Sequence, residues 1–398
     1  MLHYFNPGHE TAVLNDSPYY TLPVNPMKMQ MDLGFLPAWY SAPDDCVLVK
    51  EPLDESFKSL VYGHFPSLPA SVSEKEFLEG NRMTYNMEVS LWGNSPQSIH
   101  FFKKINERYD LHLKIPTYSG EYRRLCSRRT AQQCLQAIIS EVPNISPDII
   151  PSFFEDIKEI EMELQQNAPA DFVIKSPYSS SGRGLLWIRA GILDRASRQI
   201  LQGMLKRQYE VSLEKALHKE TDFAMLFHAD ENGTITFQAY SLFQTNTKGN
   251  YRGNVLCSQS RIRSVLTELI DESLLENAKR SIIRFLSGRI ASVYKGCICV
   301  DMMLYREKNQ IRLHPCVEIN FRYSMGWLAN TLYRDYLNED ASGHFQIEFT
   351  KHPGMISKMH QEMQSNFPLI IEHNRIISGY LSLCPVTPFS SYLAAIWV

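Results

Sequence analysis

One short stretch, residues 316–322, constrains what this chain can fold into more than any other part of it. It reads Cys-Val-Glu-Ile-Asn-Phe-Arg. Apolar and polar residues alternate along it, which is typical of a β-strand whose two faces meet different surroundings. The side chains that would face a core are those of Val317, Ile319 and Phe321. The side chains that would line the opposite face are those of Glu318, Asn320 and Arg322.

The polar face suits a particular chemistry. Carboxylate and carboxamide oxygens are hard ligands that Mg²⁺ accepts, and a neighbouring guanidinium suits phosphate oxygens. The same alternation also fits a half-exposed strand with ordinary polar residues outside. The choice between these interpretations depends on the rest of the chain.

Length and composition limit the class of protein. The 398 residues exceed one ordinary domain and predict two or three, and 44% hydrophobic residues suffice for substantial cores. Lys and Arg (40) nearly balance Asp and Glu (43), so no basic excess indicates nucleic acid and no polybasic run indicates a membrane surface. We find no apolar run of about 18 residues, and the first residues lack the pattern of a signal peptide.

Eight cysteines show no disulfide framework and are expected in a reducing cytoplasm. Zinc is the alternative for four residues on two strands that we expect to pair, namely Cys297, Cys299, His314 and Cys316. Structural zinc sites usually space their cysteines two to four apart on turns, so buried thiols are the favoured interpretation.

Residues 1–118 have the pattern of an α/β unit. A short apolar run stops at the turn signal Asn6-Pro7-Gly8, a second apolar run covers 46–49, and Ser95-Pro96 predicts the start of a helix. His9 and Glu10 follow the first turn. They either face a ligand or lie in a solvated loop.

Two features of the next segment favour anions. Arg128 stands where helical spacing begins, and free N–H groups at a helix start add to its positive field, although a basic surface turn fits as well. Lys175 ends an apolar strand before the loop 179–184, Ser-Ser-Ser-Gly-Arg-Gly. Such a loop can offer hydroxyl and backbone N–H groups to phosphates, or it can be a flexible hairpin tip. We expect Lys175, at a strand end beside a polar loop, to lie outside the core.

A second predicted strand, 297–304, carries Asp301 on its polar face and returns through a turn into the stretch 316–322. Asp301, Glu318 and Asn320 can therefore meet across adjacent antiparallel strands, although the sequence does not fix the register. Asn232-Gly233 predicts a hairpin, and Arg252 lies in a polar loop, 245–254.

In this order and spacing, the motifs resemble those of the ATP-grasp superfamily, over roughly residues 120–330. The resemblance implies a mixed α/β and α+β architecture. Its expected parts are a pre-ATP-grasp α/β domain over 1–118, a two-lobed ATP-grasp domain over 119–345 (lobes 119–215 and 216–345), and a segment over 346–398 that closes the grasp domain.

The resemblance also implies site roles. Lys175 and Arg128 would hold phosphates, with the loop closing over them through Ser180, Ser181, Gly182, Arg183 and Gly184. Residues 213–217 are similar to the hinge of D-alanine–D-alanine ligases, so Leu213 and Glu214 would meet adenine and Asp222 the ribose. Two Mg²⁺ ions would be bound by Asp301, Glu318 and Asn320.

One position departs from those ligases. They carry an arginine two residues before the first metal-binding aspartate, and this chain has Cys299 there. The charge stabiliser would then be absent or supplied elsewhere, by Arg322 or Arg252. This departure puts a D-alanine substrate in doubt and leaves the ATP-grasp chemistry intact.

The resemblance implies an enzyme that uses ATP and Mg²⁺, an ADP-forming ligase that activates a small-molecule carboxylate for attack by an amine or thiol, with carbon–nitrogen bond formation favoured. Lys175, Arg322 and Arg252 would be its catalytic charges. We expect a cytoplasmic protein without nucleic-acid or membrane partners, and a homodimer is compatible with the sequence. The alternatives are an ATP-grasp-type small-molecule kinase and a nucleotide-binding protein without turnover. The sequence does not identify the substrates.

Overall fold

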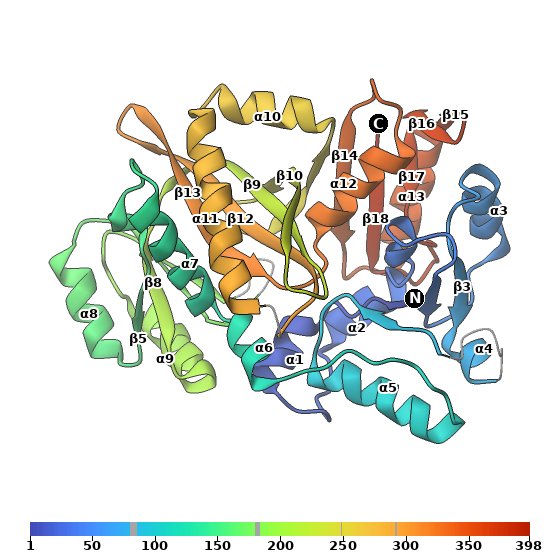
Figure 1. Cartoon of the computed structure of the whole chain (residues 1–398), viewed down its shortest axis with the longest axis horizontal. Coiled ribbons are helices and arrows are strands. Elements are labelled where there is room, and N and C mark those ends of the chain that lie inside the picture. The colour runs from blue at the N-terminus through green and yellow to red at the C-terminus, as the bar shows by residue number, and fades with distance from the viewer. Residues whose placement is uncertain (80–85, 180–183, 248, 291–292) are drawn as a thin grey trace. The chain divides into compact units, whose positions relative to one another are not determined.

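The computed structural model of the chain describes residues 1–79, 86–179, 184–247, 249–290 and 293–398 (Figure 1). The chain packs into two compact units. Unit 1 comprises residues 1–118, 252–261 and 322–398. Unit 2 comprises residues 119–251 and 262–321. Among the described residues, every helix is too short or too polar to span a bilayer.

Unit 1 contains a four-stranded parallel sheet in the order β3-β2-β1-β4. Its strands are β1 (Leu2–Tyr4), β2 (Cys46–Val49), β3 (Ala70–Ser73) and β4 (Val89–Leu91). The helices that follow these strands or connect them are α1 (His9–Asn15), α2 (Val24–Asp32), η1 (Leu36–Trp39), α3 (Glu55–His64), α4 (Glu74–Leu78) and α5 (Pro96–Tyr109).

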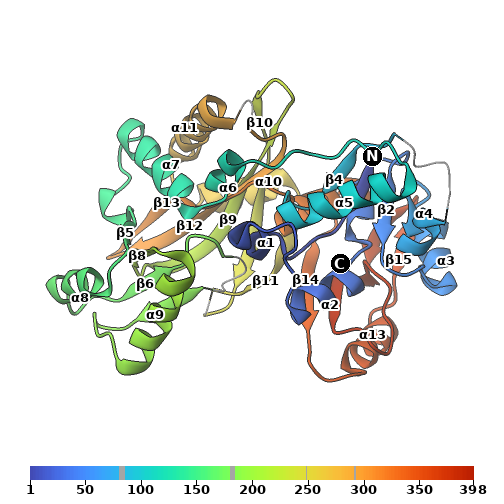
Figure 2. The ribbon, with the colours of Figure 1, turned by 90° about the horizontal axis from the view of Figure 1, so that it is seen from below.

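Helix α5 shows why this sequence folds as predicted. The Ser95 side chain accepts a hydrogen bond from the backbone N–H of Ser98, and a proline occupies the first turn, where no N–H is needed. Ile99, Phe102 and Ile105 follow at helical spacing and are buried against the sheet, which α5 flanks in Figure 2. The predicted start of this helix is confirmed.

The remainder of unit 1 is built around antiparallel strands. Strand β14 (Gly343–Phe349) pairs with β11 (Tyr251–Leu256) and β18 (Tyr392–Trp397), and β18 pairs with β17 (Tyr380–Ser382). A separate hairpin joins β15 (Ile370–Glu372) and β16 (Arg375–Ser378). The helices of this part are α12 (Met325–Tyr336) and α13 (Met355–Asn366).

Unit 2 has two antiparallel groups of strands. The first has the order β5-β8-β6-β7, with β5 (Ser152–Phe154), β6 (Phe172–Lys175), β7 (Leu185–Ile188) and β8 (Val211–Lys215). The second has the order β13-β12-β9-β10, with β9 (His218–Ala229), β10 (Ile235–Thr245), β12 (Gly296–Glu307) and β13 (Gln310–Asn320). The helices are α6 (Gly120–Leu125), α7 (Arg128–Glu141), η3 (Pro147–Ile149), α8 (Ile157–Gln166), α9 (Arg195–Gln208), α10 (Gln259–Thr267, which begins in unit 1) and α11 (Glu272–Ile290).

Helices α7 and α11 lie side by side, and α7 packs on β13 (Figure 1). The predicted strand over 316–322 overlaps the end of β13, which stops at Asn320; Ile319 and Phe321 are buried, whereas Val317 is partly exposed. The predicted hairpin is also confirmed, because Gly233, with φ of 79°, turns the chain between β9 and β10. A left-handed backbone at that position favours glycine.

Residues 322–398 belong to unit 1 together with 1–118. The expected domains, with a segment over 346–398 that closes the grasp domain, stay a prediction. The grouping in unit 1 follows from its core, where Leu381, Leu383 and Ile396 pack with Trp39 of η1. The indole N–H of Trp39 donates to the Leu383 carbonyl at 2.7 Å.

This contact generates a stability prediction. In Trp39→Phe the Leu383 carbonyl loses its donor in a buried place, so we expect the free energy of unfolding to fall by about 1–3 kcal/mol. Chemical denaturation would measure the change. Trp187→Phe, at a position 39% exposed on β7, is the matched control and should stay within about 0.5 kcal/mol of the wild type. Equal losses in both variants would contradict the role of the Trp39 contact.

Candidate functional site

The centre of the candidate site is the strand pair β12–β13 in unit 2. Asp301 lies directly opposite Glu318, and Cys299 opposite Asn320. Directly opposed residues share one face of a sheet, so these polar side chains converge. The Asn320 Nδ2 donates to Asp301 Oδ2 at 3.2 Å, and the Cys299 thiol donates to Asp301 Oδ1 at 3.3 Å. The register that the sequence left open therefore brings the three predicted metal ligands together.

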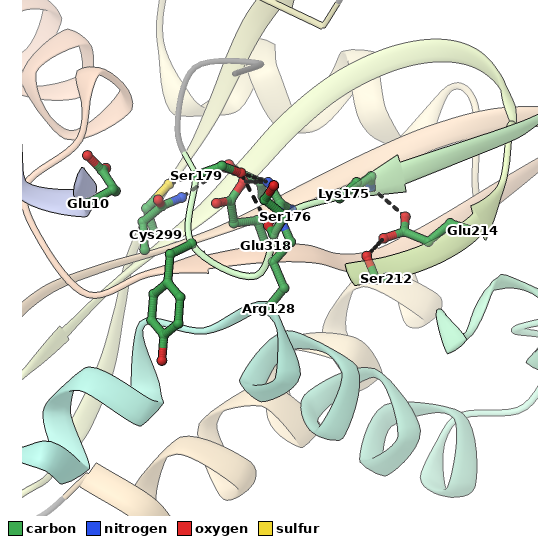
Figure 3. Close-up of polar contacts among 12 residues, drawn as sticks. Glu10, Arg128, Lys175, Ser176, Ser179, Ser212, Glu214, Cys299 and Glu318 are labelled. Atoms are coloured by element: carbon green, nitrogen blue, oxygen red, sulfur yellow. Dashed lines mark hydrogen bonds and ion pairs between the residues drawn. The ribbon is translucent and has the colours of Figure 1, made fainter. Parts of the chain in front are cut away.

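Arg128 joins this centre to the loop that follows β6. The Ser127 side chain caps α7, and the Arg128 backbone N–H donates to the Pro177 carbonyl at 3.0 Å, which fixes where the side chain starts. The guanidinium Nη2 then donates to Glu318 Oε2 at 3.0 Å, and Nε donates to the Ser176 carbonyl at 3.2 Å (Figure 3). With 10% of the Arg128 side chain and 22% of the Glu318 side chain exposed, this is a largely buried ion pair.

A second buried ion pair lies on β6 and β8. The Lys175 ammonium is 2.5 Å from Glu214 Oε2, and the Ser212 hydroxyl donates to Glu214 Oε1 at 3.1 Å (Figure 3). Burial alone would raise the pKa of Glu214, but the charge and hydrogen bond of Lys175, together with the nearby Arg128 charge, hold that pKa below its ordinary value. Our expectation that Lys175 lies outside the core is wrong. Its side chain is 11% exposed, because Glu214 compensates the buried charge.

His314 of β13 is buried near this second pair. Burial lowers the pKa of His314 to about 4, and the Glu214 carboxylate only partly opposes that shift. Its Nδ1 is buried and has no side-chain hydrogen-bond partner within the described part of the chain. The imidazole is therefore neutral at pH 7 and adds no third charge to the Lys175–Glu214 pair.

The predicted hinge connects the two strand groups of unit 2. Leu213 and Glu214 lie on β8, Leu213 is buried, and only residues 216–217 separate β8 from β9. Asp222, near the start of β9, accepts hydrogen bonds from the Lys219 ammonium at 2.6 Å and the Thr245 hydroxyl at 2.7 Å. Its carboxylate is thus held in place beside the hinge end of β9.

Other predicted site residues are not joined to this cluster. Gly184 is described, with φ of 75°, and its carbonyl accepts from the Ser176 N–H at 2.9 Å. Four residues of the loop lie outside the described part of the chain, namely Ser180, Ser181, Gly182 and Arg183. Arg252 and Arg322 belong to unit 1. Arg252 is exposed on β11 and forms no ion pair with another described residue, whereas Arg322 pairs with Glu10.

The donor set of the centre fits a hard cation. Two carboxylates and one carboxamide converge there. The Arg128 guanidinium already places one positive charge beside the Glu318 carboxylate. Within the described ranges, no cluster of three or more His, Cys, Asp or Glu side chains is arranged to hold a metal. The zinc alternative for the four Cys and His residues is therefore unsupported, and the eight cysteines, all of them within the described residues, form no disulfide.

Sequence reasoning missed two members of the site. Ser212 lies two residues before Glu214 on one strand, so strand periodicity could have placed both on one face. His314 was considered only as a zinc ligand. Its burial beside the Lys175–Glu214 pair depends on strands distant in sequence, and no local pattern signals it.

Comparison with known proteins places the fold. No protein-family model matches the chain, and no curated protein matches its sequence. The biotin carboxylase of Campylobacter jejuni, solved with β,γ-ATP, has a TM-score of 0.53 and 11% identity over 100% of this chain and 87% of that one. The biotin carboxylase domain dimer of the Hydrogenobacter thermophilus 2-oxoglutarate carboxylase, solved with MgADP, ADP and bicarbonate, has a TM-score of 0.51 and 10% identity over 100% and 86%.

A third solved structure is similar at a lower level. It is the N5-carboxyaminoimidazole synthetase of Staphylococcus aureus in complex with ADP, with a TM-score of 0.49 and 13% identity over 100% of this chain and 92% of that one. The two biotin carboxylases are ATP-grasp proteins with an N-terminal domain, and at such low identity the likeness is one of fold. The predicted ATP-grasp fold is confirmed.

The buried His314 generates a prediction on pH. The unfolded chain binds a proton near pH 6.5, and the folded chain binds it only near pH 4. Because the unfolded state holds more protons in that window, the free energy of unfolding should fall as pH drops from 6.5 towards 4, by up to about 1.4 kcal/mol per pH unit. His9 of unit 1, whose pKa burial also lowers to about 4, acts in the same direction.

His314→Gln removes one of these two contributions. Denaturation of the variant between pH 6.5 and 5, above the range where most carboxylates titrate, should show a shallower loss of stability than the wild type. An unchanged slope would contradict a buried neutral His314.

Proposed function

Because the chain has the ATP-grasp fold, we propose that it is an ATP-dependent, ADP-forming ligase that activates a substrate carboxylate as an acylphosphate for attack by an amine or thiol. The observation that carries this proposal is the convergence of Asp301, Glu318 and Asn320 beside the Arg128 guanidinium. A protein that only binds a nucleotide would not need a set of cation ligands beside a guanidinium that can bind phosphate.

The nucleotide would lie along unit 2. Lys175 and Arg128 would exchange their present carboxylate partners for the phosphate oxygens of the nucleotide, which together carry more negative charge than one carboxylate. The backbone at Leu213–Lys215 would meet adenine, and Asp222, held by Lys219 and Thr245, would meet the ribose hydroxyls. Gly184 and the preceding residues 180–183, which lie outside the described part of the chain, are proposed to contact the phosphates.

Asp301, Glu318 and Asn320 would hold Mg²⁺. When bound, Mg²⁺ offsets the charge that develops on the β- and γ-phosphate oxygens. Within this set, the Glu318 carboxylate already contacts the Arg128 guanidinium. It could exchange this positive partner for Mg²⁺.

The proposed reaction has two steps. A substrate carboxylate oxygen attacks the γ-phosphorus, the bond to the β–γ bridging oxygen breaks, and ADP leaves. The amine or thiol then attacks the acyl carbon, phosphate leaves, and the nucleophile loses a proton. Lys175 and Arg322 would stabilise the developing negative charge, with Arg252 as a further candidate. If the carboxylate is labelled with ¹⁸O, a ligase passes label into phosphate, whereas a kinase yields a stable phosphorylated product.

The first prediction from this proposal concerns Glu318. In Glu318→Gln the amide oxygen can still accept from Arg128, so the variant should fold and melt near the wild type without Mg²⁺. It should lose most of the stabilisation that Mg²⁺–ATP gives, and ADP formation should fall by at least about 10²-fold. Glu307→Gln, an exposed carboxylate on β12, is the control. Near-normal Mg²⁺-dependent turnover in Glu318→Gln would remove Glu318 from the metal site.

The second prediction concerns Lys175. Lys175→Met alone leaves Glu214 as an unpaired buried carboxylate, so it should melt well below the wild type. The double variant Lys175→Met/Glu214→Gln removes both charges and should recover most of that loss. Its affinity for ATP, measured by calorimetry, should nevertheless fall at least about tenfold, because a charge-assisted contact to phosphate is gone. Wild-type affinity in the double variant would exclude Lys175 from the nucleotide site.

We propose small molecules as the substrates. A homodimer stays a prediction for this chain. The Hydrogenobacter neighbour is described as a dimer, and light scattering of the purified chain would test the same state here.

A further inference from the structure

Unit 1 contains a pocket that the proposed function does not use. Its volume is about 420 Å³, within the range of pockets that hold small molecules. It is lined by the start of α3, by α13 with the turn that follows it, and by the segment from β17 to Val386. All of the lining residues belong to unit 1, and none of them is assigned above to ATP or Mg²⁺.

Much of the pocket wall is apolar. Phe57 and Leu60 of α3 contribute to it together with Leu369 and Leu381. Phe57 and Leu381 belong to the core of unit 1, and Leu60 and Leu369 pack against that core. The wall is therefore held in place by the packing of the unit, and it can cover the apolar part of a ligand.

Two polar side chains of α13, those of His360 and Gln364, also line the pocket. Four residues separate them, so they lie on one face of the helix. His360 Nδ1 forms a hydrogen bond of 2.8 Å with the Tyr380 hydroxyl, which leaves Nε2 without a hydrogen-bond partner among the described residues. Burial lowers the pKa of His360, although the Asp54 carboxylate opposes that shift. The imidazole is therefore neutral at pH 7 and offers a hydrogen-bonding group rather than a charge.

Asp54 is the one charged residue among the described residues that line the pocket. Its Oδ1 accepts from the Phe57 N–H at 2.9 Å and from the Ser56 hydroxyl at 2.5 Å. Partial burial acts to raise the pKa of Asp54, but these hydrogen bonds hold it below its ordinary value, so the carboxylate is ionised. Lys58 of the same helix pairs with Glu55. Asp54 itself forms no ion pair with another described residue, so its negative charge is available to a ligand.

We propose that this pocket binds a small organic cation, a primary amine whose apolar part is the size of a single ring. The ammonium group pairs with the Asp54 carboxylate, and His360 and Gln364 form hydrogen bonds at the polar side. The apolar part lies against Phe57 and Leu381. An anion is disfavoured because it would meet the like charge of Asp54, and a neutral molecule leaves that carboxylate without a counter-charge.

Three compounds of similar shape test the charge of the ligand, namely phenethylamine, phenethyl alcohol and hydrocinnamate. Binding to the full chain is followed by NMR titration at pH 7 without nucleotide. The amine should bind in the millimolar range, as expected for a ligand of this size. The alcohol should bind about threefold to tenfold more weakly, because an ion pair with a partly exposed carboxylate contributes modestly. The carboxylate should bind more weakly still.

Two variants test the residue. Asp54→Asn removes the charge and keeps an acceptor at the helix start, where asparagine caps as well as aspartate, so the variant should melt near the wild type. It should bind the amine about threefold to tenfold more weakly, while its affinity for the alcohol changes little. Glu55→Gln is the matched control, since this neighbouring carboxylate is 86% exposed and does not line the pocket. It should keep the wild-type affinity for the amine.

The proposal is overturned if the wild type binds none of the three compounds, or if it binds the alcohol or the carboxylate as tightly as the amine. It is also overturned if Asp54→Asn keeps the wild-type affinity for the amine, or if Glu55→Gln loses as much affinity as Asp54→Asn. Because the titration contains no nucleotide, its result does not depend on the ligase activity proposed for the chain.

Discussion

Three largely buried carboxylates of the candidate sites each lie against one cationic side chain, and much of the arrangement depends on this pairing. In unit 2 Glu318 pairs with Arg128, and Glu214 pairs with Lys175. In unit 1 Glu10 pairs with Arg322. A buried carboxylate without such a partner would carry an uncompensated charge, so the cations stabilise these carboxylates before they serve any ligand.

The same pairing sets what kind of ligand the unit 2 site can accept. A phosphate alone would take Arg128 and Lys175 from their carboxylates and leave negative charge in excess, and a divalent cation alone would displace Arg128 and leave positive charge in excess. In the proposed site, a nucleotide triphosphate with its cation would supply both signs at once, namely phosphate oxygens for Arg128 and Lys175 and a positive charge for Glu318. The metal–nucleotide complex would then leave less uncompensated charge than either component alone.

The sequence predicted much of this arrangement where a local period carries the information. Alternation along 316–322 gave the strand and its polar face, and Ser95-Pro96 gave the start of α5. What it could not give depends on contacts between distant segments. The register that puts Asp301 opposite Glu318, the burial of Lys175 against Glu214, and the grouping of 322–398 with unit 1 through Trp39 and Leu383 are all set by packing between residues far apart in the chain. The local sequence around Lys175 does not show that Glu214 will pair with it, so the sequence alone predicts Lys175 outside the core.

Charge pairing also explains the position at which this chain departs from the ligases it resembles, Cys299. Where those ligases carry an arginine, Cys299 donates a weak hydrogen bond to Asp301 and brings no charge. A guanidinium so close to Asp301 would compete with a metal ion for that carboxylate, whereas a thiol leaves its oxygens available. The positive charge near the proposed metal ligands comes instead from Arg128 of α7, which contacts both Glu318 and the loop after β6. Arg128 would therefore couple the carboxylate proposed to bind metal to the loop proposed to bind phosphates, so that a ligand at one would change the partner available to the other.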